Sequence, residues 1–188
     1  MPRSVYGTLP GVEVYDLVRD AWSFSGGMPV VAHPPCRLWG RMRGLAKCPD
    51  AEKEKALGLF CAVRVRESGG ILEHPARSLL WTAANLPTPG RRDEFGGWTL
   101  AAPQWWWGHK ADKASWFYIV GVEPADLPEI PLRLGESDYV VATIARYPRE
   151  HPEHRIELSK RLRSATPSSL ANWLLSVARL SSVTEAGL

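Results

Sequence analysis

The sequence predicts a single compact α/β domain over residues 1–188, in which helices cover a mainly parallel sheet. The chain is long enough to bury a core of its own. Its 45% hydrophobic and 23% charged residues are ordinary values for a globular protein, and no apolar run is long enough to span a bilayer. Between residues 28 and 75, a short apolar run, a long helical pattern and a second apolar run follow one another. This order is typical of a β-α-β unit with parallel strands.

Local patterns define the parts of this unit. The apolar run over residues 28–32 ends at His33-Pro34-Pro35 and predicts a buried strand. Asp50 is the expected N-cap of a helix over 51–67. Gly69 and Gly70 end that helix, and residues 71–75 predict a second strand that Pro75 ends.

The rest of the chain gives weaker patterns, except for one segment. Residues 114–122 are β-branched and aromatic and predict a strand. In chain order, the other expectations are a short helix over 12–22, a long loop or hairpin over 86–103 that could contact DNA, irregular chain over 123–137, an edge strand over 138–145, and a helix after Thr166 and Pro167.

Cysteine usage argues against a disulfide framework and against a standard zinc module. The chain has three cysteines, Cys36, Cys48 and Cys61, an odd number without CxxC spacing. The first residues contain no apolar signal core, so we expect a cytoplasmic protein.

Charge and aromatic content favour contact with nucleic acid. The net charge is only +3, but basic residues group at positions 37–47 and again at 160–163, where they could contact phosphates. Nine tryptophans are present. Most are expected in the core, and Trp39 and Trp107 are the best candidates for stacking on a base.

A thiol and a carboxylate follow the two strands of the predicted unit. Cys36 comes shortly after the first strand and Glu73 lies near the end of the second. The carboxyl ends of parallel strands meet at one edge, where ligands bind. A thiolate can attack an electrophilic carbon while a carboxylic acid donates a proton. Pro34 and Pro35 would hold the thiol in place, and His33 and Arg37 are expected to lower its pKa.

Four segments occur in the order of a known family. They are HPPC (33–36), GGILEHP (69–75), QWWWGHKADKASWFYIVG (104–121) and ATPSSLANWLLSVA (165–178). Together they resemble the catalytic part of the cytosine-C5 DNA methyltransferases, in a phage or prophage-type branch. The resemblance implies a reduced methyltransferase-like, Rossmann-like architecture.

The same resemblance implies catalytic roles for three residues. Cys36 would add to C6 of a flipped cytosine, Glu73 would assist at N3, and Lys113 would hold the base or the nucleophile loop. It also implies transferase activity on DNA, duplex or single-stranded. The residues expected to contact substrate or DNA are His33, Pro35, Arg37, Trp39, Arg41, His74, Trp107 and His109.

The family's cofactor is S-adenosylmethionine. Its site needs a strand, a Gly-rich turn and a ribose-binding acid ahead of the Pro-Cys loop, and only about thirty residues precede His33. No cofactor-binding residue is therefore assigned, and the transferred group stays open.

Two alternatives remain at this stage. The first is an inactive DNA-binding or antirestriction protein that retains the scaffold. The second is a metal site drawn from His33, Cys36, Cys48, His74 and His109, although no pair of them has the spacing of a structural zinc site.

Overall fold

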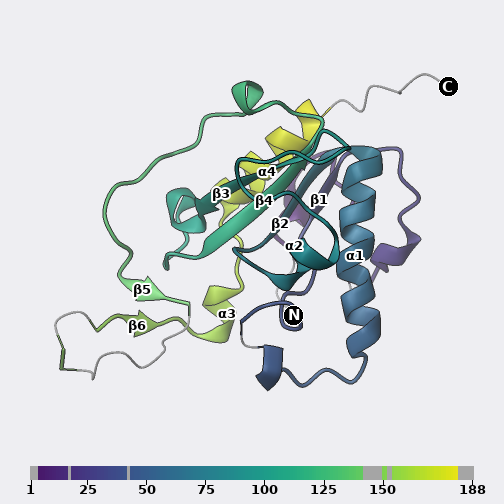
Figure 1. Ribbon diagram of the computed structural model, residues 1–188. Coiled ribbons are helices and arrows are strands. Elements are labelled where there is room, and N and C mark those ends of the chain that lie inside the picture. The colour runs from purple at the N-terminus through teal and green to yellow at the C-terminus, as the bar shows by residue number, and fades with distance from the viewer. Residues whose placement is uncertain (1–3, 17, 42, 142–149, 152–153, 182–188) are drawn as a thin grey trace.

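The computed structural model describes residues 4–16, 18–41, 43–141, 150–151 and 154–181 as one compact α/β domain (Figure 1). Its strands and α-helices are β1 (Val30–Ala32), α1 (Ala51–Ser68), β2 (Gly70–Pro75), α2 (Leu79–Ala83), β3 (Trp98–Pro103), β4 (Ala114–Val120), β5 (Tyr139–Val140), β6 (Ile156–Glu157), α3 (Lys160–Arg163) and α4 (Ser168–Leu180). None of the helices among these residues is long and apolar enough to cross a membrane.

The main sheet is mixed, which corrects the expectation of a mainly parallel sheet. Its strand order is β1-β2-β4-β3. β1 and β2 pair in parallel across α1, as predicted, whereas β4 pairs antiparallel with both β2 and β3. The chain between β3 and β4 holds only the 3₁₀ helix Gln104–Trp107. So short a link cannot make the crossover that a parallel pair requires.

Two helical layers enclose the sheet and divide the core (Figure 1). On one face, Ala62 and Val65 of α1 pack with Leu72 and Tyr118. On the other, residues of α4 pack with Ile71 and Phe117. Alternation along the strands sends odd-numbered β2 residues toward α4 and even-numbered ones toward α1 and α2. Glu73 therefore lies on the α4 face and His74 on the opposite face.

A glycine permits the close approach of β1 and β2. Gly70 has φ +114°, and a Cβ on it would lie 2.1 Å from the Val30 carbonyl oxygen. Only a residue without a side chain can occupy this position. The parallel pair, and with it the relative placement of the loops that follow the two strands, depends on Gly70.

Several segments differ from expectation. Residues 12–22 form no α-helix in their described part, and only the 3₁₀ helix Ala21–Ser23 begins there. Within the expected loop 86–103, residues 98–103 form β3, because they pair with β4. β5 pairs with β6 in a separate two-stranded sheet instead of extending the main one. Residues 142–145 of that expected strand lie outside the described residues. α4 begins after Pro167, one position later than predicted.

Candidate active site

One edge of the main sheet gathers the three residues predicted to be catalytic. β1 and β2 end there and β4 begins there, since Pro75 at the end of β2 pairs with Ser115 near the start of β4. Cys36 follows β1, Glu73 lies near the end of β2, and Lys113 directly precedes β4. The charges of Glu73 and Lys113 both act on the Cys36 thiol, which agrees with a position of all three groups at this edge.

Glu73 is buried and fully engaged in hydrogen bonds. Only 7% of the residue is exposed. Its Oε1 accepts hydrogen bonds from Gln104 Nε2 at 2.7 Å and Ser115 Oγ at 2.6 Å. Its Oε2 lies 3.0 Å from His33 Nδ1. A buried carboxylate with donors on both oxygens is an anion held in place by the protein.

The ionisation of Glu73 reflects these partners. Burial by itself would raise the pKa of the carboxyl group, but the His33 hydrogen bond and the charge of Lys113 outweigh it and lower that pKa to about 2. Glu73 is therefore ionised at neutral pH.

His33 links Glu73 to the N-terminal segment. The second ring nitrogen, Nε2, lies 2.7 Å from the hydroxyl of Tyr6. Tyr6 belongs to the 3₁₀ helix Val5–Thr8, which packs against α4. Burial, with a smaller contribution from the Glu73 charge, raises the pKa of Tyr6, so Tyr6 remains a neutral phenol.

Cys36 is exposed at the start of a tight turn. Its carbonyl oxygen accepts hydrogen bonds from the backbone amides of Trp39 and Gly40, so the turn fixes its backbone. Partial burial of the thiol raises its pKa, and the nearby charge of Lys113 only partly offsets this. The expectation of a lowered thiol pKa is wrong, because His33 interacts with Glu73 and Arg37 is paired elsewhere.

Arg37 forms an ion pair instead of facing the thiol. Its Nε donates to both carboxylate oxygens of Glu54 on α1, at 2.8 and 2.7 Å, and Cys48 also donates to Glu54 at 3.5 Å. This bidentate pair ties the Cys36 loop to the first turn of α1. Arg41, by contrast, is exposed and has no side-chain partner among the described residues.

Three residues expected at the nucleic-acid surface lie in the interior. Trp39 is 7% exposed within the α1 face of the core. Trp107 is 2% exposed and packs against Trp173, with ring centroids 4.9 Å apart and ring planes inclined by 53°. His109 is 4% exposed, and its Nδ1 contacts the backbone of Ala111. In this conformation none of the three rings is available to a base.

His74 lies on the face opposite Glu73. It is 1% exposed and packs near the ring of Trp81. Burial lowers the pKa of its imidazole to about 4, although the Pro35 carbonyl and Glu73 act in the opposite direction. His74 is therefore a neutral interior residue.

The residues present do not fit a metal ion or the family's cofactor. No three His, Cys, Asp or Glu side chains of the described residues are arranged to hold a metal. Between residues 4 and 29 the described chain forms two 3₁₀ helices and no strand. The strand with an acidic end that an S-adenosylmethionine site of this type requires is therefore not found there, and no step through that cofactor is derived.

Two hollows lie beside the site without including it. One, of about 170 Å³, is lined by Trp105, Trp106 and Arg155 among others. The second, of about 400 Å³, is more open and lies between Trp106 and Arg133. Neither is lined by Cys36 or Glu73. A substrate would reach Cys36 at the exposed surface of its loop.

Sequence reasoning missed three members of the site: Tyr6, Gln104 and Ser115. Gln104 and Ser115 flank Lys113 in the segment that carries the family resemblance, and a polar residue inside the apolar strand 114–122 is a signal that could have identified Ser115. Tyr6 lies 27 residues from His33 in a segment without periodicity. No local signal points to it.

Comparison with known proteins yields no relative. No family model matches the chain, and no curated protein or solved structure matches it either.

Proposed function

We propose that this protein activates a pyrimidine base of DNA by covalent addition of Cys36 to C6 of the ring. The proposal is supported above all by the convergence of an exposed thiol, a buried ionised carboxylate and a lysine at one sheet edge. Cys36, Glu73 and Lys113 are also the residues to which the methyltransferase resemblance assigns catalysis. Chemistry at ring carbons requires a base outside the stack, flipped or single-stranded, and the exposure of Cys36 allows such an approach.

The addition step requires one proton to leave sulfur and one to reach the base. As Sγ of Cys36 bonds to C6, the π electrons of the C5–C6 bond shift into the ring, N3 is protonated, and C5 becomes a nucleophilic enamine carbon. Glu73, which is ionised and acts electrostatically on the thiol, accepts the thiol proton and passes it to N3. The step then creates no net charge.

Lys113 favours the thiolate as it forms. Its charge acts on both Cys36 and Glu73. After C5 has taken an electrophile, loss of the C5 hydrogen as a proton expels Cys36 as a thiolate. The N3 proton returns through Glu73 to the sulfur, which restores the neutral aromatic ring and the thiol. The identity of that electrophile does not affect the role of these residues.

Hydrogen exchange at C5 tests the proposal without any group donor, because a solvent deuteron is itself an electrophile. Single-stranded oligonucleotides that contain cytosine or uracil are incubated with the protein in D₂O, and the nucleosides are analysed by mass spectrometry. We expect one hydrogen of the base to be replaced by deuterium. Cys36→Ala should abolish the exchange. Cys48→Ala, a matched removal of a thiol that contacts Glu54, should retain it.

Absence of exchange in the wild type, or equal exchange in Cys36→Ala, would contradict covalent activation. If exchange is found, nucleoside mass spectrometry of DNA from expressing cells identifies the transferred group by its mass.

A non-catalytic DNA-binding protein is the second candidate, favoured by one observation. The raised pKa of the Cys36 thiol leaves little thiolate at neutral pH. If the protein only binds DNA, Cys36→Ala should bind DNA as the wild type does, and the wild type should show no exchange at C5.

A further inference from the structure

Arg77 adopts a backbone conformation that is unfavourable for an arginine. Its φ is +60°, and the other non-glycine residue with positive φ in the described chain is Asn85, a type that tolerates it. The Ser78 amide donates to the Pro75 carbonyl at 3.2 Å, so Arg77 is the third residue of a tight turn. That position in a turn with positive φ is normally occupied by glycine. An arginine there costs about 1 kcal/mol of strain.

The turn is held rigidly between the two neighbouring loops. The Ala76 amide donates to the Ala114 carbonyl at 3.0 Å, beside Lys113. On the other side the Leu79 amide donates to the Trp39 carbonyl at 3.1 Å, close to Arg41. The strained residue is therefore positioned by hydrogen bonds on both flanks.

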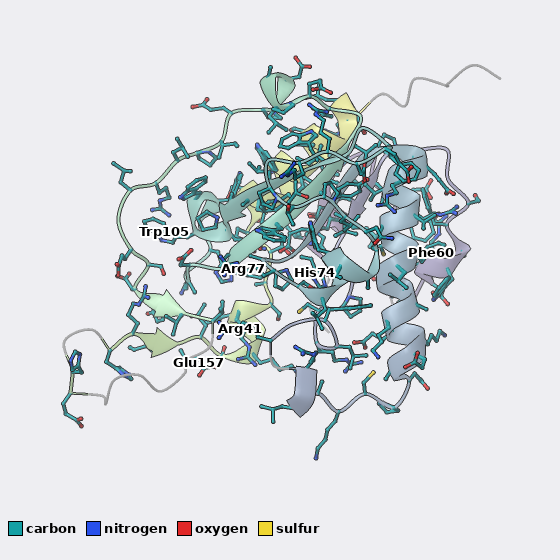
Figure 2. The ribbon with its side chains drawn as sticks, in the orientation of Figure 1. Arg41, Phe60, His74, Arg77, Trp105 and Glu157 are labelled. Carbon is teal, nitrogen blue, oxygen red and sulfur yellow. The ribbon has the colours of Figure 1, made fainter. Side chains whose placement is uncertain are left out.

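Each of these three loops carries a cation without a partner. The side chains of Arg41, Arg77 and Lys113 form no hydrogen bond or ion pair with any described residue. Arg77 is exposed and follows Glu73 by four positions on the same chain segment. In the view of Figure 2, Arg77 and Arg41 lie one above the other near the middle of the molecule. Arg41 and Arg77 thus present positive charge on the loops around the candidate site that none of the described residues pairs.

We infer that Arg77, with Arg41, binds a phosphate group of the nucleic acid whose base reaches Cys36. Strained backbone often lies at ligand-binding sites, and the Arg77 side chain forms no hydrogen bond or ion pair with a described residue. A guanidinium group is suited to a phosphate through paired hydrogen bonds. The inference rests on the proposed function for the identity of the ligand. The phosphate could belong to the target nucleotide itself or to a neighbouring position of the strand.

The test separates the binding role from the backbone strain. Arg77→Gly removes the guanidinium and relaxes the turn, so we expect a protein that is slightly more stable and binds DNA less well. Arg77→Gln removes the charge and keeps the strain. Binding of a fluorescent cytosine oligonucleotide is measured by anisotropy across a salt series. Both variants should weaken binding about tenfold near 0.1 M salt and reduce the slope of log K against log salt by about one.

Arg179→Gln is the matched control. Arg179 is an exposed arginine in the last turn of α4, outside the segment 86–103, and its Nη2 donates to the Pro10 carbonyl at 2.8 Å. The control should bind as the wild type does. An equal loss in Arg179→Gln would indicate a general charge effect and overturn the site, as would unchanged binding and salt slope in both Arg77 variants.

Two further measurements identify the source of the phosphate and separate this inference from the proposed function. A loss of affinity for dCMP in Arg77→Gly supports contact with the phosphate of the target nucleotide. A loss for the oligonucleotide alone supports contact with a neighbouring phosphate. Exchange at C5 by the wild type, with unchanged DNA affinity in the Arg77 variants, would overturn the phosphate site and leave the proposed function intact. Weakened DNA binding in the Arg77 variants, with no exchange at C5 by the wild type, would support the phosphate site and contradict the proposed function.

Discussion

Glu73 shows at the scale of single residues why the site is ordered before any substrate arrives. Transfer of a carboxylate into the interior is costly unless its oxygens are paired. Gln104, Ser115 and His33 supply three donors from three different segments. The amide of Gln104 is oriented by this contact, because a carboxylate can only accept and the nitrogen must face it. The anion therefore fixes the surrounding polar groups.

Replacing Glu73 should cost stability as well as activity. In Glu73→Gln the amide brings its own donor toward Gln104 and Ser115, so we expect the free energy of unfolding to fall by about 2 kcal/mol. Urea denaturation measures it. Cys36→Ala is the control, since its exposed side chain predicts a change below about 0.5 kcal/mol. Equal values for the two variants would show that the Glu73 network does not stabilise the fold.

At the scale of elements, the packing of α1 explains why Trp39 belongs to the core. Gly58 of α1 leaves space for the indole of Trp39, since a Cβ there would lie 2.9 Å from its Nε1 and 3.2 Å from Leu80 Cδ1. Trp39 thus connects the Cys36 loop to the helix. In this fold the buried indole of Trp39 anchors the Cys36 loop to the core and is not exposed for stacking on a base.

The substitution Gly58→Ala sets helix propensity against packing. Alanine in place of glycine favours a helix by about 1 kcal/mol, whereas the overpacking predicted at Trp39 costs about 1–3 kcal/mol. We expect a net loss of about 1 kcal/mol of unfolding free energy. Gly44→Ala, where an added Cβ meets nothing within 4 Å, should change it little. A more stable Gly58→Ala would mean that Trp39 is free to move away from α1.

At the scale of the whole molecule, two buried titratable groups on opposite faces of β2 couple folding to pH. The pKa of His74 is lowered to about 4 and that of Glu73 to about 2. Below the ordinary pKa of each group, the unfolded chain binds a proton that the folded chain excludes. Stability is therefore lost as the pH falls, first through His74 and then through Glu73.

His74 should change the free energy of unfolding within a defined pH range. Between pH 6.5, its ordinary value, and about 4, the free energy of unfolding should decrease by about 3 kcal/mol in total. In His74→Phe, which retains an aromatic ring beside Trp81, this decrease should be largely absent above pH 4.5. Urea denaturation across this range measures both proteins. Parallel curves would show that His74 does not titrate between the folded and unfolded states.

Local pattern predicted the elements with strong periodicity or clear boundaries. β1, α1, β2 and β4 lie where the apolar runs and the Asp50 and Gly69 signals put them. The expected helix over 12–22 is absent from the described residues, since a short pattern without a strong cap depends on tertiary packing. The sequence predicts only a loop or hairpin over 86–103, because the glycine- and proline-rich residues before β3 hide a strand whose stability comes from pairing with β4.

The sequence by itself determined the β-α-β unit and the order of Cys36, Glu73 and Lys113 along the chain, because these follow from periodicity and from motifs that neighbouring residues carry. Only the tertiary structure decided that β4 runs antiparallel beside β2, that Tyr6 reaches His33, and that Trp39 and Trp107 point inward. These features depend on contacts between distant segments. Strand pairing and burial of apolar area determine such contacts, and no local pattern encodes them.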